Sequence, residues 1–147
     1  MGLTGMSILL TGYRYNTKDV LASINKHKST HLMMVPTMTV DMINLLEKDY
    51  IRLPSLEAII TGSAQTPVKV AEKFLHLNQD IKKFSIRYGS TETGGCMAMP
   101  LPGESPNSTI DNVGKTLDHC EIKIVDPKSG ELKTIGEEGA CIFMFLQ

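Results

Sequence analysis

The sequence contains no tryptophan, and aromatic residues make up only 5% of its 147 positions. It also lacks an excess of positive charge, because 15 Lys and Arg residues are balanced by 16 Asp and Glu residues, for a net charge of −1. Proteins that bind the backbone of a nucleic acid concentrate Lys and Arg on the binding face. Nucleic acid is therefore not an expected partner.

Long apolar segments are absent too. The longest apolar runs, residues 32–36 and 141–146, fall far short of the roughly 20 residues that a membrane-spanning helix needs. The chain does not open on a charged segment followed by an apolar one, so we expect neither a transmembrane segment nor a secretory signal. Cys96, Cys120 and Cys141 are widely spaced and form no CxxC pair. This spacing argues against a disulfide framework or a zinc site and favours reduced thiols in an intracellular protein.

What is present is the composition of a globular protein, with 41% hydrophobic and 21% charged residues. The apolar pattern predicts strands over residues 32–35, 56–61 and 84–88 and helices over residues 18–28, 39–48 and 66–75. Asn16 or Thr17 is suited to cap the first helix, Thr39 or Asp41 begins the second, and Pro67 suits the first position of the third. Short strands that alternate with amphipathic helices favour βαβ units and a parallel sheet, which define an α/β fold.

The pattern changes after Gly95. Residues 99–112 contain several prolines and are typical of a loop. Residues 121–125 and 131–135, on either side of a turn over residues 126–130, predict a β-hairpin. Residues 140–146 predict a last strand. This strand is so apolar that we expect another strand to lie beside it. We therefore predict an α/β subdomain over residues 1–98 and a β-rich subdomain over residues 99–147, truncated at its C-terminus.

Two predicted strands end in polar, glycine-containing segments, residues 61–64 and 88–95. Ligands of parallel sheets bind beyond the carboxyl ends of the strands. In the second segment Gly89 permits a sharp turn, Tyr88 offers a flat face for a base, and Glu92 is an oxygen ligand of the kind that Mg²⁺ takes. The hydroxyls of Ser90, Thr91 and Thr93 are suited to bind phosphate oxygens. The alternative, from the residues alone, is a solvated loop of small polar side chains.

Residues 88–92, Tyr-Gly-Ser-Thr-Glu, resemble the Tyr-Gly-x-Thr-Glu motif of the superfamily of adenylate-forming acyl-CoA synthetases, adenylation domains and luciferases. Other segments resemble further landmarks of that superfamily, in the same order: residues 30–38, 61–64, 113–115, 122–126 and 136–139. The ordered set covers nearly the whole chain. Within the superfamily, the sequence is most similar to the medium-chain fatty acyl-CoA synthetases.

The resemblance implies an acid–CoA ligase in which a carboxylic acid, a fatty acid here, reacts with ATP to form an acyl-adenylate and then with coenzyme A. It implies that Thr91 bonds the ATP phosphate, that Glu92 holds Mg²⁺, and that these two residues are catalytic. The nucleotide-binding set that it implies is Ser63, Ala64, Gln65, Arg87, Tyr88, Gly89 and Ser90, with Tyr88 stacked on adenine. Gly95 and Cys96 would lie near the acyl group. A mitochondrial location follows if the medium-chain resemblance holds.

The sequence also departs from the superfamily. Gln65 stands where Pro is frequent, and Arg87 stands where Gly is frequent. The family's phosphate loop with its Lys, its ribose-binding Asp and its C-terminal domain with the adenylation Lys do not occur in these 147 residues. We therefore expect the chain alone to be inactive and to need the missing parts of a parent enzyme. Three hypotheses stay open: the middle of a ligase domain, a non-catalytic module that binds nucleotide or acyl-adenylate, and a fragment without function.

Three other patterns have simpler interpretations. Gly114-Lys115-Thr116 ends like a phosphate-binding P-loop, but the first glycine of that pattern is replaced by Thr109. His27 and His31 are four residues apart without a third metal ligand nearby, which favours a solvated pair. Met33, Met34, Met38 and Met42 are expected in the hydrophobic core rather than in an acyl pocket.

Overall fold

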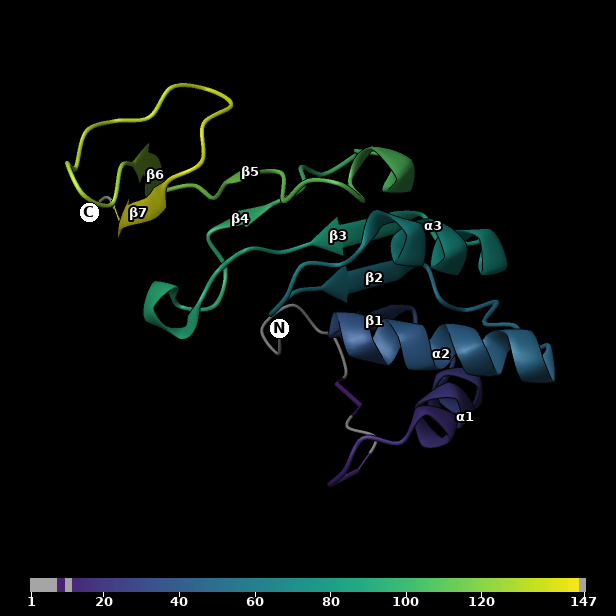
Figure 1. Ribbon diagram of the computed structural model, residues 1–147. Coiled ribbons are helices and arrows are strands. Elements are labelled where there is room, and N and C mark those ends of the chain that lie inside the picture. Colours follow the sequence, from purple (N-terminus) through teal and green to yellow (C-terminus); the bar gives the residue numbers. More distant parts are fainter. Residues whose placement is uncertain (1–7, 10–11, 146–147) are drawn as a thin grey trace.

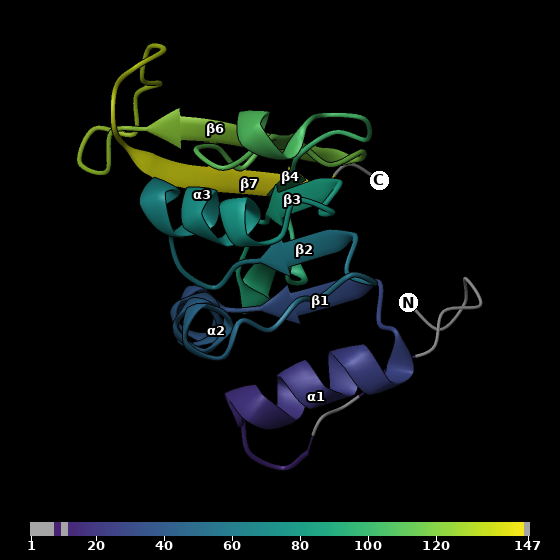
Figure 2. The ribbon, with the colours of Figure 1, turned by 90° about the vertical axis from the view of Figure 1, so that its right-hand side faces the viewer.

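The computed structural model describes residues 8–9 and 12–145. Its centre is a parallel sheet of three strands in the order β1 (His31–Met34), β2 (Ala58–Thr61) and β3 (Lys83–Ile86). Helix α2 (Pro36–Asp49) connects β1 to β2, and α3 (Val68–Leu77) connects β2 to β3. The two helices pack together on one face of the sheet, and α1 (Thr17–His27) packs against α2 (Figures 1 and 2). The predicted α/β fold is confirmed.

The helix ends follow from local chemistry. The Asn16 side chain caps α1, because its oxygen accepts hydrogen bonds from the N–H groups of Lys18 at 2.9 Å and Asp19 at 3.4 Å. The start predicted for α2 was wrong: this helix begins at Pro36, three residues before Thr39. Proline suits the first turn of a helix, where its missing N–H leaves no hydrogen bond unmade. Pro67 precedes α3 as its cap residue and is not its first helical residue.

The hydrophobic core lies between the sheet and the two crossover helices. Every residue of the central strand β2 is buried, and Met42, Phe74 and Phe84 are almost completely inaccessible. The expectation that all four methionines belong to the core was wrong for Met33, whose side chain is 61% exposed. Alternate residues of a strand point to opposite faces, so Met33 points away from the face on which its neighbour Met34 is buried.

Short strands dominate the second part of the chain. Strand β4 (Ala98–Met99) pairs with β5 (Lys115–Thr116), and β6 (Cys120–Val125) pairs with β7 (Ala140–Phe145), both antiparallel. The predicted hairpin between residues 121–125 and 131–135 was therefore wrong, since only one isolated bridge, Val125 to Leu132, joins them. The side chains of Leu132 and Ile135 are exposed and bury nothing, whereas β7 offers six consecutive partners. The last strand thus has its neighbour in β6.

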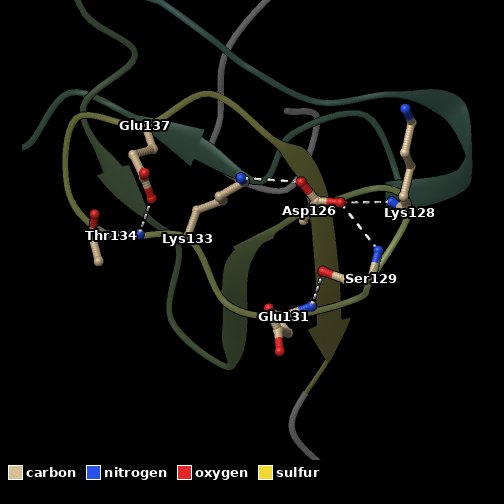
Figure 3. A network of polar contacts seen from close by, with 7 residues as sticks. All are labelled: Asp126, Lys128, Ser129, Glu131, Lys133, Thr134 and Glu137. Atoms are coloured by element: carbon tan, nitrogen blue, oxygen red, sulfur yellow. Dashed lines mark hydrogen bonds and ion pairs between the residues drawn. The ribbon is translucent and has the colours of Figure 1, made fainter.

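The connection between β6 and β7 is ordered by polar contacts around Asp126 (Figure 3). Its carboxylate accepts hydrogen bonds from the backbone N–H groups of Ser129 at 3.0 Å and Lys128 at 2.8 Å, and Lys133 forms an ion pair with it at 3.0 Å. These contacts, the one from Ser129 first, lower the pKa of Asp126. The turn predicted over residues 126–130 is confirmed, with the Gly130 N–H bonded to the Asp126 carbonyl at 2.9 Å.

The structure shows where two of these motifs lie. Lys115 and Thr116 form β5 and open no helix, so the stretch that ends at Thr116 is not a phosphate-binding loop. His27 ends α1 while His31 begins β1, and residues 8–9 and 12–145 contain no group of three side chains suited to hold a metal. No helix in this described part is both long and apolar enough to cross a membrane.

Gly114 is a position where the fold requires glycine. Its φ is +75°, and an added Cβ would lie 2.2 Å from the backbone carbon and oxygen of Met99. Gly130 has almost the same φ, +74°, but open space around the position of a Cβ. We predict that Gly114→Ala lowers the free energy of unfolding by about 1–3 kcal/mol more than Gly130→Ala does, because only the first adds a backbone clash to the cost of a left-handed conformation. Urea unfolding followed by circular dichroism measures both, and equal losses would contradict the close approach.

Candidate functional site

A cavity of about 380 Å³ lies beyond the carboxyl ends of β2 and β3. Three chain segments line it, together with Val68 at the start of α3: residues 63–66 after β2, residues 86–89 at the end of β3, and residues 110–113 from the second part of the chain. This is the edge of a parallel sheet where ligands bind. The volume is within the range of about 300–1,000 Å³ that is usual for small-molecule sites.

The first wall of the cavity is the turn after β2. The β2–β3 ladder continues one step beyond the strands, because the Arg87 N–H donates to the Thr61 carbonyl at 2.8 Å. The buried hydroxyls of Thr61 and Thr66 bond to each other at 3.2 Å and close the base of the turn. Ser63 has a φ of +69°, and a Cβ on Gly62 would lie 3.0 Å from the Arg87 oxygen. The turn is therefore pressed against β3, with residues 63–65 exposed at the cavity.

The motif after β3 forms a closed loop. Tyr88 and Ala98 pair across its neck, where the Tyr88 N–H donates to the Ala98 carbonyl at 3.0 Å. Inside the neck, the Gly95 N–H donates to the Ser90 carbonyl at 2.8 Å. A Cβ on Gly89 would lie 2.7 Å from the Gly95 oxygen, a distance that no side chain tolerates. The glycine that follows Tyr88 is therefore required for the loop to close.

The tip of this loop is a short 3₁₀ helix, η2 (Thr91–Thr93). Thr93 is buried, and its hydroxyl accepts from the Ser90 N–H at 2.8 Å and donates to the Ser90 carbonyl at 2.9 Å. The expectation that the Thr93 hydroxyl is offered to a phosphate was therefore wrong. Thr91 and Glu92 are exposed. The Ser90 hydroxyl, and secondarily the backbone N–H of Glu92 itself, lower the pKa of the Glu92 carboxyl.

The structure brings some of the predicted site residues together at the cavity and leaves others outside it. Those that line the cavity are Ser63, Ala64, Gln65, Arg87, Tyr88 and Gly89. Those that do not line it belong to the tip and the returning arm of the motif loop: Ser90, Thr91, Glu92, Gly95 and Cys96. The Cys96 thiol instead donates to the Ala98 carbonyl at 3.5 Å.

Sequence reasoning missed the third wall, residues 110–113, because residues 99–112 were expected to be only a loop. Thr109 fixes this wall: it is 2% exposed, and its hydroxyl donates to the Phe84 carbonyl of β3. Asn112 donates to the Ser108 carbonyl at 2.8 Å and accepts from the Gly114 N–H at 2.9 Å. The asparagine beside the Val-Gly landmark was the available signal, since Asn side chains order turns through such bonds.

Two cavity residues have distinctive electrostatics. The charge of the neighbouring Cys141 of β7, and secondarily a hydrogen bond with it, raises the pKa of the Tyr88 hydroxyl, and Tyr88 is 43% exposed. Arg87 lines the cavity, and its buried Nε has no hydrogen-bond partner. The site therefore combines an aromatic ring with a cationic residue that has one buried donor unpaired.

Comparison with known proteins identifies relatives. The model of the AMP-binding enzyme family matches residues 3–143. The mitochondrial medium-chain acyl-CoA ligase ACSF2 of Danio rerio is 31% identical over 139 residues, which are 95% of this chain and 23% of that protein. The acyl-CoA ligase SID4 of Ajellomyces capsulatus is 27% identical over 92% of this chain and 23% of its own length. The chain thus spans about a quarter of the length of these curated relatives.

Solved structures share the fold. A long-chain-fatty-acid–CoA ligase of Archaeoglobus fulgidus superposes with a TM-score of 0.80 at 21% identity, over 89% of this chain and 27% of that one. The O-succinylbenzoate coenzyme A synthetase of Bacillus subtilis, solved in complex with AMP, gives a TM-score of 0.69 at 27% identity, over 90% of this chain and 26% of that one.

The buried Thr109 hydroxyl supports a prediction about the third wall. Thr109→Val keeps the shape of the side chain but leaves the Phe84 carbonyl without its partner, and we expect it to lower the free energy of unfolding by about 1–3 kcal/mol. Amide hydrogen exchange at residues 110–113 should accelerate as well. Thr109→Ser keeps the hydroxyl and should protect those amides nearly as well as the wild type. Equal exchange in the wild type and Thr109→Val would show that the hydroxyl does not hold the wall.

Proposed function

Because this chain belongs to the AMP-binding enzyme family, we propose that it is the nucleotide-binding part of an ATP-dependent fatty acid–CoA ligase. The observation that carries the proposal is the cavity at the carboxyl ends of β2 and β3, on whose rim the Tyr-Gly-Ser-Thr-Glu loop begins. The ligase names of the relatives from Danio rerio and Ajellomyces capsulatus support it. The chain spans only 23% of the first of these, so the complete reaction is proposed for a longer ligase.

In this proposal the cavity takes the adenine base. Tyr88 provides a neutral aromatic ring for stacking, which suits a flat heteroaromatic ligand. Ser63, Ala64 and Gln65 enclose the opposite side, and Gly89 lets the ligand approach the backbone closely. The solved relative with bound AMP supports a nucleotide as the ligand.

The phosphates would then extend toward the loop tip. We assign Thr91 to a phosphate oxygen and Glu92 to Mg²⁺, with the Ser90 hydroxyl bonded to the Glu92 carboxylate and lowering its pKa. The residues present fit the metal, because Mg²⁺ beside phosphates takes one or two carboxylates and completes its shell with phosphate oxygens and water. When bound, the ion would neutralise charge on the outer phosphates. Thr91 and Glu92 would position the nucleotide rather than react with it.

The reaction proposed for the longer ligase has two steps. A carboxylate oxygen attacks the α-phosphorus of ATP and pyrophosphate leaves, which gives an acyl-adenylate. The thiol of coenzyme A then attacks the acyl carbon, loses its proton, and AMP leaves. Gly95 and Cys96, on the returning arm of the motif loop, are assigned to the acyl side. The 147-residue chain alone is proposed to bind nucleotide without turnover.

The substrate and the location belong to the same proposal. Relatives described as medium-chain acyl-CoA ligases support a medium-chain fatty acid, and their description as mitochondrial supports that compartment. The division of the chain into subdomains over residues 1–98 and 99–147 stays a prediction, with the motif loop at the end of the first.

A titration tests the metal role of Glu92. We predict that Glu92→Ala weakens binding of Mg·ATP by about tenfold while binding of AMP changes little, because Mg²⁺ contacts the outer phosphates that AMP lacks. Glu72→Ala, on the exposed side of α3, is the matched control and should change neither affinity. Isothermal calorimetry with both nucleotides measures the difference.

The outcomes separate the hypotheses. Equal weakening of Mg·ATP and AMP by Glu92→Ala would remove Glu92 from the metal. Saturable binding of a non-hydrolysable acyl-adenylate that is lost in Thr91→Ala would support the assigned site. A chain that is folded by circular dichroism but binds neither nucleotide nor acyl-adenylate would contradict the proposed function and favour a remnant without activity.

A further inference from the structure

Arg87 lines the cavity, and its side-chain Nε makes no hydrogen bond. Its backbone is fixed on both sides, since its N–H donates to Thr61 at 2.8 Å and its carbonyl oxygen lies 3.0 Å from the position of a Cβ on Gly62. The side chain leaves this rigid point, directly before Tyr88, and contributes to the cavity wall. Only the side-chain torsions are therefore free to respond to a ligand.

One donor of the Arg87 guanidinium, its Nε–H, lacks an acceptor. Its Nε is buried and makes no hydrogen bond, and none of the ion pairs found in the described part of the chain involves it. A guanidinium carries five N–H donors and no acceptor. Leaving a buried donor unpaired costs free energy. A rotation of the side chain that brings this donor to an acceptor on a ligand recovers that cost. Asp111 is the other charged residue that lines the cavity, and its carboxylate accepts from the Asn112 amide at 3.0 Å.

The remaining lining indicates which acceptor fits. Apolar side chains and the Tyr88 ring surround much of the cavity, which suits a flat, weakly polar ring rather than a phosphate; the apolar members are Ala64, Val68, Ile86, Ile110 and Val113. A purine presents unprotonated ring nitrogens as acceptors, and adenine also presents an exocyclic amine. A group that donates hydrogen bonds and accepts none can pair with a ring nitrogen, whereas the amine repels it.

We propose that Arg87 is a specificity-determining residue that donates a hydrogen bond to a ring nitrogen of the purine base in this cavity. The inference rests on the proposed function, because it places the base of the nucleotide between the Ser63–Gln65 turn and Tyr88. It opposes a purely steric view of Arg87, in which a long side chain only occupies space that the base needs.

Deaza analogues test the contact, since each replaces one ring nitrogen by C–H and removes one acceptor. The full chain is titrated by calorimetry with AMP and with its 1-deaza, 3-deaza and 7-deaza analogues. The wild type should bind one of the three analogues about tenfold more weakly than AMP, the loss of one hydrogen bond to a charged group. Arg87→Met, which keeps the length of the side chain without its donors, should bind AMP about tenfold more weakly and no longer distinguish that analogue. Arg52→Met, an exposed change before β2 at the other end of the sheet, should leave all affinities unchanged.

Other results would overturn the inference. If Arg87→Met or Arg87→Gly binds AMP more tightly than the wild type, Arg87 obstructs the base. If Arg87→Met weakens AMP but keeps the same discrimination among the analogues, Arg87 contacts the phosphate or ribose instead. A folded wild type that binds no AMP would refute the proposed function together with the inference, whereas AMP binding without any effect of the deaza positions would refute the inference alone.

Discussion

At the carboxyl ends of β2 and β3, two pairs of main-chain segments approach closely, one so closely that it leaves no room for a side chain and one that leaves little. Gly62 lies against the carbonyl of Arg87, and Gly89 lies against Gly95 and Cys96, where a Cβ would come within 2.7–2.9 Å of backbone atoms. The first contact presses the turn after β2 onto β3, and the second closes the motif loop at its neck. The site depends on both, because they determine where Tyr88 and the loop tip lie relative to the sheet.

Hydrogen bonds within the protein use some of the polar groups around these contacts and leave others for a ligand. Thr61 bonds Thr66, Thr93 bonds both backbone groups of Ser90, and each of these hydroxyls is used within the protein. The groups left open to a ligand differ in kind: a carboxylate at Glu92, an aromatic ring at Tyr88 and an arginine at Arg87 with an unpaired Nε. A nucleotide together with Mg²⁺ has complementary groups for all three, which is why this separation of roles supports the proposed function.

Local patterns in the sequence were sufficient to predict the alternation of strands and helices, the Asn16 cap and the segments at the strand ends. They failed where packing or competition between partners decides. Helix α2 starts at Pro36 because proline favours the first turn as much as it ends a strand, and β7 displaced residues 131–135 as the partner of β6. The wall at residues 110–113 depends on a tertiary contact, the bond from Thr109 to Phe84, which no local pattern contains. The Thr93 hydroxyl is used locally by Ser90, three residues earlier, in a capping pattern that the sequence interpretation overlooked.

Segments from three parts of the chain line one cavity, which we propose as the site for an adenine nucleotide. Two-dimensional NMR of the isotope-labelled chain during titration with AMP tests this proposal, because each backbone amide reports separately. We expect saturable shifts that cluster at residues 63–66, 86–89 and 110–113, with amides of α1 and of β6 unchanged. Shifts confined to one of these segments, or centred away from the carboxyl ends of β2 and β3, would contradict it.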